Sequence, residues 1–392
     1  MTLRLSFVAA ALEDVFSVTE LASQYGVSRK TAYKWIHRFL EEGVDGLVDH
    51  PSIARFVANR TPAHIEDVLV ELRTKRGWGP KKLLKVLGKR RPDLRLPSRS
   101  TVAEILKRRG LVRTRQKRQR QPHPGRPDSQ PLAANQIWGV DFKGQFRTRD
   151  GIYCYPFTVS DLYSRFLICC DGYLSTSYEG VRRSLEIAFR QYGLPEAIRS
   201  DNGSPFASTG IARLSRLGVW LLRLGVRREL IQPGRPTQNG RHERMHKTLK
   251  SEAIRPPEAN LPGQQRRFDD FRHDFNHERP HEALGQITPA ELYHPSPRPF
   301  PEKLPEPVYP PHFEVRRVSR NGGIRWKSHW LNVGHSLIEQ HLGFEQVDDG
   351  TWDAYFSTLR LGRFNERDLR LIGTIATHPR CGKRGNLPSA RD

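Results

Sequence analysis

The feature that most constrains how this chain of 392 residues folds is a change of hydrophobic period near residue 136. Three runs rich in β-branched and aromatic residues follow one another there, as consecutive strands do. Beyond them, runs with helical spacing alternate with short strand-like runs. The strand-like runs are QIWGVDFKGQF, YCYPFTVSDLY, RFLICCDGYL, LPEAIRSDNG and VRRELI, and the helical ones are TSYEGVRRSLEIAFRQYG, a stretch near 208–222 and GRHERMHKTLK. This order predicts an α/β layered core over residues 132–295.

Residues 1–55 carry the pattern of a helix-turn-helix. Ser17 and Glu20 have the spacing of a capping box, and Gly26 supplies a tight turn before a second helix capped by Ser28. The second helix would turn its apolar residues inward and leave its basic residues outside. Those basic residues are Arg29, Lys30, Lys34 and Arg38. We therefore predict a DNA-recognition helix, with an ordinary helical hairpin as the alternative.

The first sixteen residues, MTLRLSFVAAALEDVF, allow two interpretations. Leu5, Val8, Leu12 and Val15 recur with helical spacing, which predicts a first core helix. The alternative is a short signal peptide, because one arginine precedes an apolar run. Acidic residues follow that run at once, so we favour the helix.

The rest of the chain divides by composition. Residues 56–112 repeat the helical pattern of the first segment. After the core, a proline-rich stretch leads into a β-rich segment with an Asn-Gly-Gly hairpin signal. The predicted segments are a second helix-turn-helix-like domain at 56–112, a basic linker at 113–131, a Pro-rich linker at 296–312, a small C-terminal β-barrel at 313–372 and a disordered tail at 373–392.

The charge of the chain indicates a polyanionic partner. Lys and Arg total 65 against 42 Asp and Glu, a formal net charge of +23. Such an excess favours nucleic acid, because neutralising phosphates releases counterions. The alternatives are a basic surface without a specific partner and a surface that binds an anionic membrane. No apolar run approaches the length of a membrane span. The 4 cysteines fit no disulfide framework, which indicates a reducing, cytoplasmic compartment.

Three carboxylates fall where a cation site would need them. Asp141 lies within the first predicted strand, Asp201 where a later strand ends, and Glu243 on a late helix. Elements in this order would bring the three to one edge of the sheet, and oxygen ligands suit Mg²⁺. Lys247 and Lys250 share a helical face with Glu243 and are expected to bind DNA phosphates.

The same helix contains a competing motif. HERMH matches the H-E-x-x-H pattern of zinc proteases, in which two histidines on one helical face hold the metal. We reject that interpretation because it leaves the helix-turn-helix and the net charge unexplained. His242 and His246 are then expected to support the carboxylates, to face DNA or to lie on the helix surface.

Taken in order, four motifs resemble the integrase-core transposases of bacterial insertion sequences, which are relatives of retroviral integrases. These are W-x-x-D-F, S-D-N-G-x-x-F, G-R-x-E-R-x-x-x-T-L-K and FNHERPHEALGQITPAELY, and the resemblance spans residues 5–295. It implies an RNase H-like fold and an Asp-Asp-Glu triad of metal ligands. The gap of 41 residues between Asp201 and Glu243 is longer than usual, so Glu229 and Glu252 remain alternatives for the third ligand. No His/Cys zinc module precedes the core.

The resemblance implies a DNA transposase that uses two Mg²⁺ or Mn²⁺ ions. Asp141 and Asp201 would hold the first ion, and Glu243 would complete the second site with Asp141. The expected partners are double-stranded DNA, as terminal inverted repeats and as target, and further copies of this chain, with no membrane. A DNA-binding regulator with an inactive core and an RNase H-like nuclease without joining activity are the alternatives.

Overall fold

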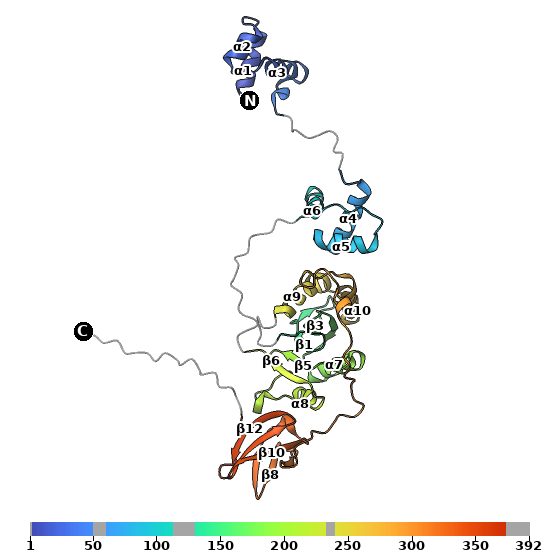
Figure 1. Ribbon diagram of the computed structural model, residues 1–392, viewed down its shortest axis with the longest axis vertical. Coiled ribbons are helices and arrows are strands. Elements are labelled where there is room, and N and C mark those ends of the chain that lie inside the picture. Colours follow the sequence, from blue (N-terminus) through green and yellow to red (C-terminus); the bar gives the residue numbers. More distant parts are fainter. Residues whose placement is uncertain (1, 50–59, 113–129, 233–239, 374–392) are drawn as a thin grey trace, which may run out of the picture. The chain divides into compact units, whose positions relative to one another are not determined.

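The computed structural model (Figure 1) describes residues 2–49, 60–112, 130–232 and 240–373. Contacts between Cα atoms divide the chain into two compact units, Met1–His64 and Ile65–Asp392. None of the helices in the described ranges is both long and apolar enough to cross a membrane. Most of the predicted basic linker at 113–131 and of the tail at 373–392 lies outside the described residues.

The first unit confirms the predicted helix-turn-helix. Ser17 and Glu20 form the capping box, and the Ser28 hydroxyl accepts a hydrogen bond from the backbone N–H of Thr31. The helices are α1 (Thr2–Leu12), α2 (Val18–Gln24) and α3 (Arg29–Glu42), followed by a 3-10 turn at Gly43–Leu47. Their shared core consists of Phe7, Val8, Leu21, Ala22, Ala32 and Leu47.

A second group of three helices packs around its own apolar cluster. Leu69, Leu83 and Val102 are fully buried within it, one from each helix. Ser98 caps the last helix, and Gly110, with φ of +69°, follows its end. The three helices are α4 (Ala63–Arg76), α5 (Pro80–Arg90) and α6 (Arg99–Arg108).

The predicted α/β core is built on a mixed sheet. Its strands are β1 (Ile137–Phe142), β2 (Phe146–Arg147), β3 (Tyr153–Asp161), β4 (Leu167–Tyr173), β5 (Ala197–Ser200) and β6 (Arg227–Leu230). The order is β2-β3-β1-β5-β6, with β4 also paired to β3. β3 is antiparallel to β1 and β4, whereas β5 is parallel to β1 and β6. The parallel strands are joined through helices, as such connections require.

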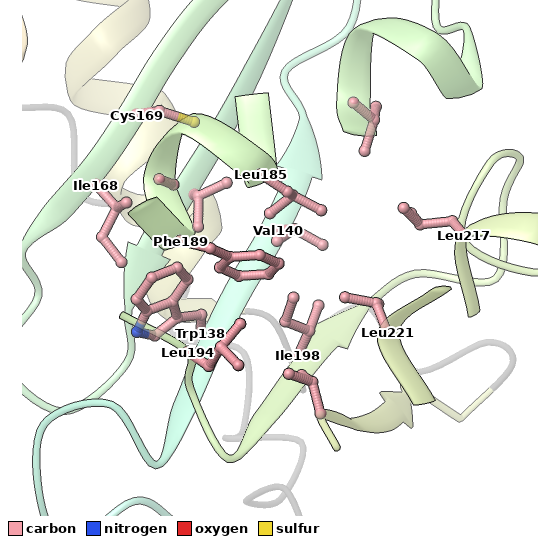
Figure 2. Packing of buried hydrophobic residues seen from close by; sticks show 14 of the residues in the cluster. Trp138, Val140, Ile168, Cys169, Leu185, Phe189, Leu194, Ile198, Leu217 and Leu221 are labelled. Atoms are coloured by element: carbon pink, nitrogen blue, oxygen red, sulfur yellow. The ribbon is translucent and has the colours of Figure 1, made fainter. Parts of the chain in front are cut away.

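Helices cover both faces of this sheet. α7 (Tyr178–Tyr192) and α8 (Arg216–Arg223) pack on one face, where Trp138 and Val140 of β1 meet Phe189 of α7 (Figure 2). α9 (Gly240–Leu249) and α10 (Leu261–His273) pack on the other face. Because successive strand residues point to opposite faces, the residues of β1 between Trp138, Val140 and Phe142 face α9.

The C-terminal segment is an open sheet rather than the predicted barrel. Five antiparallel strands follow the order β13-β12-β11-β10-β7, and β8 and β9 pair only with each other. This hairpin contributes Ile324 and Trp326 to the core of the segment, so it packs on the sheet instead of joining its edges. No closed barrel is seen among the described residues. The strands are β7 (Glu314–Arg317), β8 (Gly323–Trp326), β9 (His329–Asn332), β10 (His341–Asp348), β11 (Thr351–Phe356), β12 (Leu359–Asn365) and β13 (Ile372–Gly373).

Candidate active site

Asp141 faces α9 because of its position in β1. Asp141 pairs with Thr158 of β3, and Gly139 pairs with Ser160, so these four residues share the face of the sheet that α9 covers. Gly139 allows the close approach. A Cβ at this position would lie 2.8 Å from Leu162 Cδ2 and 3.2 Å from His242 Nδ1.

Asp201 follows β5 directly, next to Asp141. In the parallel register, Gly139 lies opposite Arg199, so two more residues along each strand bring Asp141 and Asp201 level. The Asp201 carboxylate accepts a hydrogen bond of 3.1 Å from the backbone N–H of Gly203. That contact closes the turn with both Asn202 and Gly203 at negative φ, so no left-handed residue is needed there.

α9 presents different residues to the sheet and to solvent. Met245 and Leu249 are buried among apolar side chains of β3, β4 and α10. Glu243 and Lys247 are exposed, and Lys250, also exposed, begins the π-helical turn Lys250–Ile254. Glu243, Lys247 and Lys250 are thus all accessible to solvent, with the last residue just beyond the α-helix, and phosphate binding by the lysines stays a prediction.

The two histidines of HERMH are buried rather than on the helix surface. His242 is 1% exposed and His246 is 5% exposed. Their Nε2 atoms lie 2.7 Å and 2.8 Å from the Thr158 hydroxyl, which also lies 3.1 Å from the backbone oxygen of Asp141. A carbonyl oxygen only accepts, so the single hydroxyl proton goes to Asp141 and both imidazoles donate. Ser160 then donates to His242 Nδ1 at 3.1 Å.

The electrostatics of the site are dominated by burial and by the acidic residues. The pKa of Asp141 is raised to about 7, chiefly by burial and then by the charges of Asp201 and, less, of Glu243, against the opposing effects of the Phe142 backbone hydrogen bond and of Lys143. Burial lowers the pKa of His242 to about 3 and that of His246 to about 2. Both imidazoles are therefore neutral at pH 7, in agreement with the hydrogen-bond assignment.

The two alternative third carboxylates are engaged elsewhere. Glu229 accepts hydrogen bonds from Arg199 at 2.9 Å and 3.1 Å. Glu252 forms an ion pair of 2.5 Å with Arg279. Of the three, Glu243 is the one whose charge is among the main causes of the raised pKa of Asp141. In the described ranges, no three His, Cys, Asp or Glu side chains lie close enough together to hold a metal ion as they stand.

The remaining site candidates lie on α3, in the other unit. Arg29, Lys30 and Lys34 are exposed, and Arg38 is half-buried. None of the four is part of the apolar cluster of that unit. A basic helix face is thus available, as the sequence predicts.

Several supporting residues were not identified from the sequence. Thr158 and Ser160 hold the histidines, and Lys143 acts on the Asp141 charge. Lys143 stands two positions after Asp141, which is the spacing that puts two strand residues on one face. Asn276, by contrast, lies in the fourth motif quoted above; it exchanges two hydrogen bonds, of 2.7 Å and 2.9 Å, with the backbone of Leu167 in β4 and so braces the sheet.

Family profiles match the chain in four places. Residues 131–236 and 224–289 match families described as Integrase core domain. Residues 3–55 match a Helix-turn-helix domain and residues 31–106 match a Homeodomain-like domain.

Two bacterial insertion-element proteins are similar to part of the chain. A 31.7 kDa uncharacterized protein of insertion element IS407, from Burkholderia multivorans, is 32% identical over 184 residues, which are 46% of this chain and 63% of that protein. A 39.2 kDa uncharacterized protein of IS476, from Xanthomonas euvesicatoria, is 32% identical over 162 residues, which are 40% and 44% of the two chains. The similarity thus spans less than two thirds of either relative.

Solved structures of viral integrases align only loosely. A simian T-cell lymphotropic virus intasome, in complex with a PP2A regulatory subunit, aligns with 74% of this chain and 97% of its own chain, at 18% identity and a TM-score of 0.38. The HTLV-2 integrase catalytic core domain in complex with magnesium aligns with 42% of this chain and 100% of its own, at 15% identity and a TM-score of 0.34.

Proposed function

We propose that this protein is a DNA transposase that cuts and joins DNA strands. The premise is that residues 131–289 are an integrase core domain of the retroviral-integrase-like superfamily. Its similarity to insertion-element proteins supports this proposal. The domain limits are those predicted above, with helix-turn-helix units at 1–55 and 56–112 that read the ends of the element. Because two ends must be joined together, the protein would act as a homo-oligomer on DNA, in the bacterial nucleoid.

The observation that carries the proposal is the electrostatic coupling of three carboxylates. Asp141 and Asp201 stand at the ends of adjacent parallel strands, and both Asp201 and Glu243 raise the pKa of Asp141. Carboxylates that repel one another in a partly buried site are stabilised by a divalent cation. An all-oxygen donor set also fits Mg²⁺ or Mn²⁺.

Asp141 and Asp201 would hold one ion, and Glu243 would complete a second site with Asp141 when DNA binds. Bound ions of this kind supply activation of the attacking oxygen and neutralise charge on the phosphorus. The Thr158 hydroxyl holds the backbone of Asp141 in place, and Lys247 would contact phosphates. In the first reaction, water attacks the phosphorus at the element end and the P–O3′ bond breaks. In the second, the freed 3′-hydroxyl attacks a target phosphate and releases a target 3′-hydroxyl.

A strand-transfer assay tests the proposal. Labelled duplexes that carry the inverted repeats flanking the gene are incubated with the protein, Mg²⁺ and plasmid target. The parent protein should produce joined strands, and Asp201→Asn should bind the duplex but produce none. Asp269→Asn removes an exposed carboxylate of α10 and should join strands like the parent.

The products separate the alternatives. Nicked or linear DNA without joined strands would favour a nuclease, and binding without cleavage would favour a regulator. Joining by Asp201→Asn at the parental rate would refute the triad.

A further inference from the structure

α9 has a third face, which lines a small basic cavity. Arg241 and Arg244 stand on this face, and Arg165 follows β3 on the same side. Arg279 and His281, beyond α10, and Lys82 of α5 also line the cavity. We call this cavity the Arg165 pocket. Its volume is about 130 Å³, several times the roughly 30 Å³ that one water occupies in the liquid, so a group of phosphate size has room.

Polar atoms of the Arg165 pocket lack partners. Arg165 Nε and His281 Nε2 are buried and make no hydrogen bond within the described residues. Burial lowers the pKa of Arg165 to about 10, and the nearby charges of Arg241 and Arg244 contribute. Arg165 is half-buried, and a partly buried guanidinium whose Nε has no partner favours the binding of an anion there.

The acidic residues around the pocket do not relieve this charge. Asp161 also lines the pocket, but its carboxylate accepts hydrogen bonds from the backbone N–H of Asn135 at 2.8 Å and from Ser164. Glu252 is paired with Arg279. Arg244 is exposed, so the pocket is open to solvent on its side.

We propose that the Arg165 pocket binds a phosphate oxyanion, and that during the reaction this oxyanion is one backbone phosphate of DNA lying along α9. Guanidinium groups bind phosphate oxygens by charge-assisted hydrogen bonds, and Arg is the residue best suited to this contact. Burial and the charges of Lys82 and Arg279 lower the pKa of His281 to about 3, so its imidazole is neutral and the guanidinium groups carry the contact. DNA as the source rests on the proposed function, whereas phosphate binding itself does not.

The first arm of the test uses inorganic phosphate and the full-length protein without divalent cations. Phosphate should raise the unfolding temperature of the parent more than chloride of equal ionic strength does. Arg165→Met should weaken phosphate binding about tenfold or more, because a charge-assisted contact is lost. Its stability in phosphate-free buffer should be unchanged or higher. Arg149→Gln, an exposed arginine elsewhere in the core, is the matched control.

The second arm replaces single phosphates of a bound duplex by neutral methylphosphonates. At one linkage, neutralisation should weaken binding by the parent about tenfold and by Arg244→Gln less than twofold. Because Arg244 is exposed, this variant keeps the fold in either case.

Each result has a defined consequence. Equal stabilisation by phosphate and chloride would contradict phosphate binding in the Arg165 pocket. Unchanged phosphate binding by Arg165→Met would contradict it as well. Phosphate binding without a linkage that depends on Arg244 would assign the pocket to free phosphate and overturn the DNA source. Neither arm requires strand cleavage, so failure of the transposase proposal would be detected separately, in the strand-transfer assay.

Discussion

Replacing Thr158 by valine tests the network that holds α9 over the sheet. Valine keeps the shape of threonine but lacks the hydroxyl, which donates to the Asp141 backbone and accepts from His242 and His246. Thr158 is fully buried, so water does not replace the lost partner.

The expected loss follows from the groups left without partners. Two buried imidazole N–H groups lose their acceptor, and each such loss costs about 1–3 kcal/mol. Changing the tautomer of either ring would only leave a lone pair unsatisfied instead. We therefore expect a destabilisation of about 2–6 kcal/mol, which lowers the unfolding temperature by roughly 4–20 °C for a domain of this size.

Thermal unfolding of three proteins provides the measurement. Thr158→Ser keeps the hydroxyl and loses one buried methyl, so it should cost only about 1 kcal/mol. Strand transfer should follow the same order, since the hydroxyl fixes the backbone of Asp141. The reasoning is wrong if Thr158→Val unfolds at the parental temperature, or if serine is as damaging as valine.

Three further predictions follow from the same face of the core and from α3. Gly139→Ala should destabilise the protein by about 1–3 kcal/mol in denaturant unfolding, because the added carbon overpacks the contacts with Leu162 and His242. Unchanged stability would contradict the close approach. The pKa of His242 is lowered from 6.5 to about 3, so between these values the unfolded chain binds a proton that the folded chain does not. As the pH drops below 6.5, the free energy of unfolding of the parent should therefore decrease by up to about 1.4 kcal/mol per pH unit. The stability difference between the parent and His242→Gln should shrink over the same range. A difference that stays constant would refute the assignment. Lys34→Gln should reduce the slope of log affinity against log salt by about 1 for duplex DNA, and an unchanged slope would remove this residue from the interface.

Local patterns were sufficient where one element decides the outcome. The caps at Ser17 and Ser28, and the order of strands and helices, depend on neighbouring residues and hydrophobic period, and they are present. The predicted core helix α1 is present, but its buried side was predicted only in part: Val8 is fully buried, whereas Leu5 is 39% exposed. Leu12 is 51% and Val15 70% exposed, whereas Phe7 is buried against the rings of α2 and α3. Packing against α2 and α3 determines which side of α1 is buried, and the apolar stripe of α1 alone does not predict it.

His242 and His246 show that strand pairing is needed to identify the partners of buried polar residues. His242 and His246 were expected to support the carboxylates, to face DNA or to lie on the surface, and they bind Thr158 inside the protein. A signal was present, because Thr158 and Ser160 are polar at alternate positions of an otherwise apolar strand. Polar residues at that spacing indicate a polar partner on one face, but only the pairing of β1 with β3 identifies it.

The C-terminal sheet shows that a pattern of short strands does not determine how the sheet edges pair. Short alternating strands are equally compatible with an open sheet and a closed barrel, since closure depends on which edges pair. Of the two tryptophans in its hairpin, Trp326 is 2% exposed and Trp330 is 47% exposed. Their spacing of four residues across the hairpin did not reveal that only one faces inward.

The central claim is that Asp141, Asp201 and Glu243 hold divalent cations together, and Mn²⁺ binding in the presence of DNA tests it most directly. Titration of the DNA complex, followed by water-proton relaxation, should show two ions bound to the parent. Asp141→Asn, Asp201→Asn and Glu243→Gln should each bind fewer or bind them more weakly, whereas Glu252→Gln should match the parent. Full binding by Glu243→Gln, or loss of binding in Glu252→Gln, would contradict the account.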